Sequence, residues 1–388
     1  SFLIATILLI CRTCITFKCT YLGKERDVGV EDVIDIGIKG KALCSFKDGS
    51  LLVYRKGSFY LFQPDKKKQL NQFTLPIHQT KKILCHFRLL ERLLHTEPRW
   101  AIPIDNDNVY IFFEGKMYRV NARSGKFTEE QLPVRGKPLT IIKIKAINGF
   151  SDSFALGDYG QNNNREEVRI YQKHSGTSEW RIACSFPKGT VRHIHALVPD
   201  PLRNRVLILT GDEDLESGIW AAYNDFSKIE PVLVGKQKYR TCQAIPYKDR
   251  IYFLSDKPSE ENYLWIIDEK DKEILQTEAI RGSCIYGRVV GERGIFSTTC
   301  EPEAHAKNKV DYWLSTRPGK GVKDNKIDII LIENGELSVI STFQSDGMPL
   351  RLFQYATATF AYSSDDKIYF TPQCVKRYDM HVFMLNKD

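Results

Sequence analysis

The sequence predicts a single all-β domain, a β-propeller in which seven blades are favoured over six. Short apolar segments alternate with charged or glycine-containing turns along most of the 388 residues, as the strands of hairpins do. This pattern recurs in units of roughly 45 to 60 residues, which is typical of four-stranded propeller blades. Polar residues also recur after the second strand of successive units, beginning at Asp158, Gly211, Ser255 and Thr299.

The first unit shows the hairpin pattern clearly. Residues 42–46, 51–54 and 59–62 are apolar, and the pairs Asp48-Gly49 and Lys56-Gly57 separate them. Aspartate or lysine followed by glycine is a typical hairpin turn, because glycine accepts the backbone angles that a tight turn requires. The unit therefore predicts three consecutive antiparallel strands.

The later units repeat this organisation with insertions. The second contains a helix-compatible segment at residues 87–94, which one or two helical turns would accommodate outside the blade. The sixth contains two polar loops, at residues 301–309 and 317–325. The second to seventh units span residues 81–133, 138–187, 192–235, 237–280, 282–343 and 349–385.

The last unit supplies only three clear strands. The apolar run at residues 4–17 is long enough to provide the fourth, as an outer strand against residues 381–385. Pairing the two ends of the chain would close the ring and remove exposed sheet edges. The predicted domain therefore covers residues 1–388. The same run is shorter than the roughly 20 residues of a membrane-spanning helix, and no clear signal peptide is present.

Composition indicates a globular protein and argues against several classes. Hydrophobic residues make up 42% of the chain, enough for a sizeable core. The net charge is +8, but the basic residues are dispersed and no nucleic-acid-binding motif accompanies them, so nucleic acid is not a predicted partner. The ten cysteines are scattered and predict no disulfide framework. Cys11 and Cys14 have CxxC spacing without a second pair, and we interpret them as packing thiols.

Candidate functional residues converge on one face of the predicted disc. In a blade, the loop that enters the first strand and the loop between the second and third strands open on the same side. His193 and His195 lie two apart on a strand, so both imidazoles point the same way. They could share acid and base roles near neutral pH, or they could be hydrogen-bonded histidines lining a solvated channel.

The same imidazoles could hold a divalent metal ion, which leaves the cofactor open. A metal would require one or two further ligands. The available carboxylates are Asp212, Glu213, Asp214 and Glu301.

Arg240 is the one evident arginine near the predicted axis. Its planar guanidinium could bind a substrate carboxylate or sulfate in two-point fashion. Alternatively, it could pair with Asp256 or Asp212 and join adjacent blades. Tyr159 lies near these loops of the predicted face. It could stack on a sugar ring or belong to the core.

Several motifs resemble those of known propellers. Ser175, Gly176, Thr177 and Trp180 resemble a degenerate Asp-box, the turn between the third and fourth strands in BNR-repeat, sialidase-like propellers, although the acidic position is absent. Across about residues 80 to 310, the segments Arg192-His193-Ile194-His195, Thr210-Gly211-Asp212 and Gly235 to Arg240 are similar to uncharacterised bacterial BNR-type proteins. The arginine triad and tyrosine-glutamate pair of hydrolytic sialidases are not found.

The resemblance implies a carbohydrate-directed protein that binds or cleaves an anionic glycan in an axial pocket. If it is an enzyme, a glycoside hydrolase or polysaccharide lyase is the expected type. The expected catalytic residues are His193, His195, Arg240, Glu301 and Tyr159, and the expected substrate-binding residues are Asp158, Asp212, Gln237 and Asp256. The alternative is a non-catalytic lectin or protein-interaction scaffold. The sequence predicts neither the compartment nor the oligomeric state.

Overall fold

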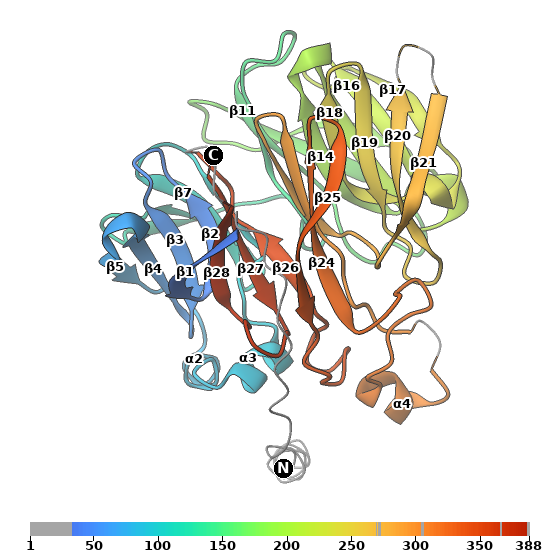
Figure 1. Ribbon diagram of the computed structural model, residues 1–388. Helices are drawn as coiled ribbons and strands as arrows, with labels where there is room; N and C mark the ends of the chain where they lie inside the picture. The colour runs from blue at the N-terminus through green and yellow to red at the C-terminus, as the bar shows by residue number, and fades with distance from the viewer. Residues whose placement is uncertain (1–32, 269, 271–272, 304–305, 365–366, 386–388) are drawn as a thin grey trace.

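The computed structural model is a seven-bladed β-propeller (Figure 1). It describes residues 33–385 apart from 269, 271–272, 304–305 and 365–366. Within these residues the strands form seven four-stranded antiparallel sheets, and each sheet is one blade. The predicted fold class and blade number are confirmed.

The first six blades each use four strands that are consecutive in the chain, because short turns connect neighbouring strands. The strands of blades 1 to 3 are β2 (Lys41–Ser45), β3 (Leu51–Arg55), β4 (Ser58–Gln63), β5 (Lys68–Phe73); β6 (Trp100–Pro103), β7 (Asn108–Phe113), β8 (Lys116–Asn121), β9 (Phe127–Glu130); β10 (Ile142–Ile144), β11 (Ser153–Gly157), β12 (Val168–His174) and β13 (Arg181–Phe186). The strands of blades 4 to 6 are β14 (His193–Asp200), β15 (Arg205–Gly211), β16 (Gly218–Tyr223), β17 (Lys228–Val234); β18 (Thr241–Tyr247), β19 (Arg250–Ser255), β20 (Asn262–Asp268), β21 (Glu273–Ile280); β22 (Tyr286–Val290), β23 (Arg293–Ser297), β24 (Lys326–Glu333) and β25 (Glu336–Gln344).

Blade 7 joins the two ends of the described chain. Its order is β26 (Thr357–Phe360), β27 (Ile368–Gln373), β28 (His381–Leu385) and β1 (Val33–Lys39). Closure of the ring by N- and C-terminal strands is therefore confirmed, but the strand that pairs with β28 is β1. Because β27 and β1 occupy both edges of β28, the place predicted for residues 4–17 is filled. Residues 4–17 lie outside the described residues.

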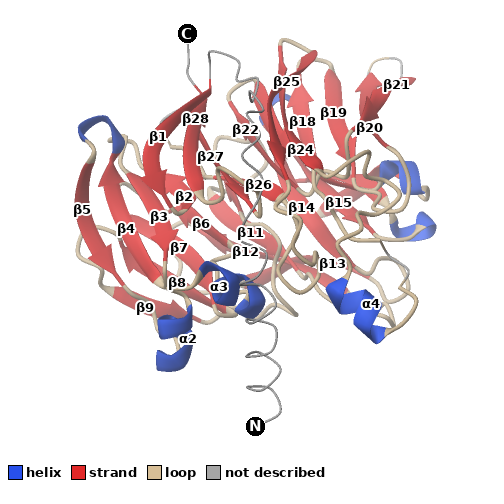
Figure 2. Cartoon of the chain, turned by 60° about the horizontal axis from the view of Figure 1, so that its bottom comes forward, coloured by secondary structure: helices blue, strands red, loops and turns tan. Residues whose placement is uncertain are grey.

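Three short helices lie at one end of the strands, at the bottom of Figure 1, and Figure 2 turns this end toward the viewer. They are α2 (Gln79–Leu84), α3 (Arg88–Leu94) and α4 (Lys309–Leu314). The first two connect blades 1 and 2, where a helical insert was predicted, and α4 lies between the second and third strands of blade 6. We call this end the entry face, because the loops that enter the first strand of each blade lie here. Among the described residues, no helix is long and apolar enough to cross a membrane.

The hydrophobic core is divided into clusters between neighbouring blades. One cluster, for example, joins blades 2 and 3 and contains Trp180, which is 9% exposed, together with Tyr171 and Phe154. Ser175 and Gly176 form the turn between β12 and β13, the position that an Asp-box occupies. All seven cysteines from Cys44 to Cys374 in the described chain are free thiols. Cys11 and Cys14 lie outside the described residues.

Candidate functional site

Five of the predicted site residues meet near the propeller axis on the entry face. His193 begins β14, the inner strand of blade 4, and Asp212 follows β15 in the same blade. Arg240 precedes β18, the inner strand of blade 5, and Asp256 follows β19. The predicted convergence therefore occurs across two adjacent blades. We call His193, His195, Asp212, Arg240 and Asp256 the axial cluster.

A β-bulge positions the second histidine. His193 and Ile194 pair with Gly211 and Thr210, but the next residue to pair is Ala196, so His195 is the extra residue in β14. Such a bulge twists the strand and redirects a side chain. A Cβ at Gly211 would lie 2.9 Å from Cε1 of His195. Glycine at this position therefore leaves the space that the His195 ring occupies.

Backbone carbonyls fix the hydrogen on each imidazole. Nδ1 of His193 lies 3.0 Å from the carbonyl oxygen of Gly160, and Nδ1 of His195 lies 3.0 Å from the carbonyl oxygen of Thr241. A carbonyl only accepts, so each Nδ1 is the donor. In the neutral form of each ring, Nε2 then presents a lone pair.

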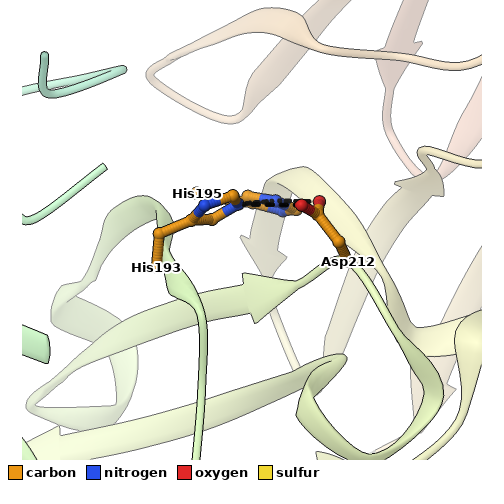
Figure 3. Close-up of side chains that lie close together, drawn as sticks. All are labelled: His193, His195 and Asp212. Carbon is orange, nitrogen blue, oxygen red and sulfur yellow. Dashed lines mark hydrogen bonds and ion pairs between the residues drawn. The ribbon is translucent and has the colours of Figure 1, made fainter. Parts of the chain in front are cut away.

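The two imidazoles and the Asp212 carboxylate contact one another (Figure 3), and we call the space between their facing atoms the centre. The two Nε2 atoms are 3.0 Å apart. Nε2 of His195 is 3.2 Å from Oδ1 of Asp212, and Nε2 of His193 is 3.5 Å from Oδ2. Three acceptors in contact repel one another, so the centre favours a proton or a metal cation. These three residues could hold a metal ion, and Cys242 and Asp256 form a second such group with His195.

Asp212 is ionised in this setting. Burial would raise the pKa of its carboxyl group, but hydrogen bonds from His193 and His195, which form when Nε2 carries a proton, and the charge of Arg240 hold it well below its usual range. Arg240 approaches Oδ1 at 3.2 Å, and Arg192 approaches Oδ2 at 3.4 Å. Asp212 is therefore a fixed negative charge beside the imidazoles.

Arg240 also pairs with the second carboxylate of the axial cluster. Its Nε and Nη2 atoms each lie 3.3 Å from Oδ2 of Asp256. The Cys242 thiol also donates to this oxygen, at 3.4 Å. Because Asp212 and Asp256 share the guanidinium, Arg240 joins blades 4 and 5, as one of the two sequence interpretations expected.

Glu301 lies beside the axial cluster in blade 6. Burial and the nearby Asp256 charge raise the pKa of its carboxyl group to about 7. Ser283 donates to Oε2, and the Tyr355 hydroxyl lies 3.4 Å from Oε1. A carboxyl group that is half protonated near neutral pH can serve as a general acid.

The other predicted residues support the loops or pack against the axial cluster. Both carboxylate oxygens of Asp158 accept backbone amides, those of Arg135 and Arg169. Gln237 donates to the carbonyl oxygen of Asp212 at 2.5 Å and so holds the loop that presents it. The Tyr159 ring packs on His193, with 4.5 Å between ring centroids.

The remaining carboxylates proposed as metal ligands have other partners. Glu213 pairs with Arg192 at 2.8 Å. Asp214 accepts the backbone amide of Gln237 at 2.9 Å. Of the four candidate carboxylates, Asp212 is the one that forms a ligand group with the two histidines.

The largest cavity described lies next to the axial cluster, over blades 1, 2, 6 and 7. Its volume is about 690 Å³, and its lining includes Arg99, Lys137, Tyr286, Arg351 and Tyr355. None of the axial cluster residues lines it. The two are connected through Tyr159, because the Arg99 guanidinium lies 5.6 Å from the centroid of the Tyr159 ring, which packs on His193.

The cavity narrows along the axis toward the opposite face. Tyr362 of blade 7 donates its hydroxyl to the carbonyl oxygen of Ile141 in blade 3. The Arg288 guanidinium lies 3.4 Å from the centroid of the Tyr362 ring. The adjoining space between the inner strands holds only about 70 Å³. A ligand of the large cavity would therefore enter from the entry face.

The sequence analysis did not identify the cavity residues. Arg99, Lys137 and Arg351 come from three different blade-entry segments, and Tyr312 and Trp313 come from α4. No local sequence motif links these residues. The three basic residues precede the inner strand of a blade, which is the same criterion by which His193 and Arg240 were selected. Applying that positional criterion to every blade would have identified the basic residues.

Comparisons with known proteins support the fold. No protein-family model matches the chain. No curated protein matches it either. Among solved structures, it is similar to U3-55K, with 7% identity, a TM-score of 0.53 and coverage of 92% of this chain and 99% of that chain. A chain of the mitotic checkpoint complex gives 8% identity, a TM-score of 0.52 and coverage of 95% and 96%.

A bacterial protein gives a comparable match. The extracellular domain of a putative one-component system from B. thetaiotaomicron has 11% identity and a TM-score of 0.51. The match covers 94% of this chain, which spans only 40% of that domain's length. At such identities the likeness concerns the β-propeller fold.

Proposed function

We propose that the entry face binds an anionic glycan in the 690 Å³ cavity, as expected of a sialidase-like propeller. The observation that supports this is a set of cations on the cavity wall that have no carboxylate partner among the described residues. Arg99 donates to the carbonyl oxygen of Lys137 at 3.0 Å, and Arg351 donates to the carbonyl oxygens of Glu303 and Tyr312. Their positive charges remain available to a ligand carboxylate or sulfate.

Aromatic rings beside these cations suit a sugar. Trp313 is 51% exposed and Tyr312 is 40% exposed, although large aromatic side chains usually lie buried. The Arg351 guanidinium lies 4.2 Å from the centroid of the Tyr312 ring, so charge and an apolar surface adjoin. A pyranose ring with a carboxylate presents the complementary pair of an apolar face and an anionic group.

The cavity replaces Arg240 as the proposed anion site. Arg240 is shared by two carboxylates, so a ligand carboxylate would have to displace Asp212 or Asp256. Arg99 and Arg351 bind carbonyl dipoles instead, and an anion can join these contacts without displacing a charge. Glu301, which lies behind Tyr355 on the cavity wall, is the residue best placed to donate a proton if the glycan is cleaved.

Binding to an array of acidic and neutral glycans tests this proposal. Arg99→Ala and Arg351→Ala should each weaken binding of an acidic glycan by about tenfold or more, since a charge-assisted hydrogen bond contributes roughly 1.5–3 kcal/mol. Arg123→Ala is the control, because Arg123 pairs with Asp48 and Asp107 away from the cavity. The carboxyl-reduced form of the same glycan should not bind.

The same samples distinguish binding, cleavage and a scaffold role. A uronide-lyase absorbance assay and a reducing-end assay with wild-type protein and Glu301→Gln would detect cleavage. Failure of the folded wild-type protein to bind any acidic glycan would exclude the proposal and favour a protein-interaction scaffold. Binding that persists in both arginine variants would place the glycan elsewhere.

A further inference from the structure

The axial cluster presents three metal-ligand atoms and no donor between them. Both Nδ1 atoms of its imidazoles are engaged by the carbonyl oxygens of Gly160 and Thr241. Metal-binding histidines commonly donate their other ring nitrogen to a carbonyl or carboxylate in this way. That hydrogen bond fixes the orientation of the ring and directs Nε2 to the ion. The ligand set of two imidazoles and one carboxylate is one that divalent transition metals accept.

The distances between the ligand atoms are close to those around a metal ion. With bonds of about 2.1 Å and angles between about 90° and 110°, ligand atoms lie about 3.0 to 3.4 Å apart. The separations here are 3.0 Å between the two Nε2 atoms, 3.2 Å from His195 to Asp212 and 3.5 Å from His193 to Asp212. The first two separations fall in this range, and the third, which ends on the other oxygen of the Asp212 carboxylate, lies just above it. The space between the three side chains is therefore close to the size of one ion.

The charges around the centre also favour a cation. Three arginines, Arg165, Arg192 and Arg240, form ion pairs with four carboxylates, Glu213, Glu216, Asp256 and Asp212. Arg192 and Arg240 also contact Asp212 itself, at 3.4 and 3.2 Å. The group as a whole therefore keeps one negative charge in excess beside the two imidazoles.

Access and rigidity are consistent with binding. The His193 and His195 side chains are buried, whereas the Asp212 side chain is 23% exposed on the entry face, so an ion can reach the centre past the carboxylate. The bulge at His195, Gly211 beside its ring and the Gln237 hydrogen bond to the Asp212 carbonyl hold the ligands in place.

We propose that His193, His195 and Asp212 bind a divalent transition-metal ion, with Nε2 of each histidine and the Asp212 carboxylate as ligands. This site is separate from the glycan cavity, and its test does not use a glycan. Water would complete the coordination on the exposed side of Asp212.

Metal binding is measured on the full chain after treatment with a chelator. Titration with ZnCl₂ by calorimetry, with elemental analysis after dialysis, should give one equivalent of zinc for the wild-type protein. His193→Ala, His195→Ala and Asp212→Asn should each weaken binding by about 100-fold or more. His381→Ala is the matched control, because His381 also lies beside a carboxylate, Asp35 at 2.8 Å, but on the periphery. It should bind zinc like the wild-type protein.

A second variant and a second metal separate this site from the thiols. Gly211→Ala removes no ligand but pushes on the His195 ring, so it should weaken zinc binding while His381→Ala does not. The Co²⁺-loaded wild-type protein should show the visible absorption of nitrogen and oxygen ligands, without the intense near-ultraviolet band of a thiolate ligand. If an alanine variant does not fold, as judged by circular dichroism, His193→Asn or His195→Gln replaces it.

Two results would overturn the proposal. One is the absence of stoichiometric zinc binding to the folded wild-type protein at millimolar zinc, which would assign the centre to a proton shared by the imidazoles. The other is zinc binding of equal affinity in both histidine variants, which would place the ion elsewhere, for example at the cysteines.

Discussion

Two groups of buried charged residues lie on the entry face, and they are built in opposite ways. The first, which we call the closure cluster, joins α3 to the loops of blade 7 and consists of Lys41, Arg88, Arg92, Glu97, Asp346 and Asp379. The second is the axial cluster. In the closure cluster, each cation contacts a carboxylate. In the axial cluster Arg240 does so too, but the imidazoles of His193 and His195 contact each other and Asp212, so acceptors also contact acceptors.

Complementarity in the closure cluster is extensive. Arg92, which is 2% exposed, pairs with Asp346 and donates to the carbonyl oxygens of Phe353 and Gln354. Arg88 binds Asp379 at 2.8 Å and also Glu97. These contacts join α3, between blades 1 and 2, to segments more than 250 residues later in the chain. They therefore reinforce the ring closure that β1 and β28 make.

The axial cluster leaves polar atoms without complementary partners. The Nε2 atoms of His193 and His195 face each other, and Oδ1 of Asp256 is buried with no hydrogen-bond partner among the described residues. Buried polar atoms are ordinarily satisfied. Burial of charge therefore does not by itself indicate function; a set of charges that needs an additional ion or proton is the stronger indication.

The largest expected effect concerns stability in the closure cluster. Arg92→Ala should lower the free energy of unfolding by roughly 3 to 5 kcal/mol, because it leaves the Asp346 carboxylate and two carbonyls without their donor. Urea denaturation followed by circular dichroism measures this change. The control Arg123→Ala should cost less than about 1 kcal/mol, since its ion pairs are exposed. Equal losses in the two variants would contradict the role assigned to Arg92.

A smaller effect should appear with pH in both regions. The pKa of Glu301, near the axial cluster, and that of Glu91, in α3, are each raised from 4.5 to about 7. Burial is the main cause, and a neighbouring carboxylate, Asp256 or Glu97, adds to it. Between these pH values the folded protein binds more protons than the unfolded chain, so each group's contribution to stability falls as pH rises from about 4.5 to 7.

Glutamine variants isolate these contributions. Relative to Glu301→Gln, the wild-type protein should lose up to about 3 kcal/mol of unfolding free energy between pH 4.5 and pH 7. The same change with pH is expected relative to Glu91→Gln. Because the other glutamate titrates equally in the wild-type protein and in the variant, its contribution cancels when the two unfolding free energies are subtracted. Urea denaturation at a series of pH values provides the measurement. A difference that does not change with pH would show that the carboxyl group has an ordinary pKa.

The fold was predictable because it depends on a repeated local pattern. Apolar strands and glycine-containing turns, as at Asp48-Gly49, identified the blades, and their period identified the propeller. The outer strand of blade 7 was not predictable in the same way. Most residues of β1 are exposed or half-buried, so its place depends on backbone pairing with β28 and not on an apolar pattern. The prediction therefore assigned this outer strand to residues 4–17, which are more apolar.

The polar residues of the axial cluster were predictable from their places in the blades, but the contacts between them were not. His193, His195 and Asp212 belong to a single hairpin. Alternation along a strand predicted that the two imidazoles point the same way, and the place of Asp212 after the second strand predicted that it lies on the same face. The bulge at His195 and the carbonyl partners of the imidazoles depend on tertiary packing, which residue spacing does not encode. Arg99 and Arg351 line the same cavity only because the ring closes. The number of residues between them in the sequence therefore predicts nothing about their proximity.

The smallest intrinsic effect is expected in the axial cluster. In the presence of a chelator, His193→Asn should change the unfolding free energy by no more than about 1 kcal/mol, because it loses one hydrogen bond to Gly160 but relieves the contact between the two Nε2 atoms. At a zinc concentration about 100 times the dissociation constant of the wild-type protein, the wild-type protein should gain about 2.7 kcal/mol and His193→Asn much less. Urea denaturation with and without zinc measures both differences, and His381→Ala serves as the control. A loss of 3 kcal/mol or more in chelator would show that the axial cluster stabilises the fold as the closure cluster does.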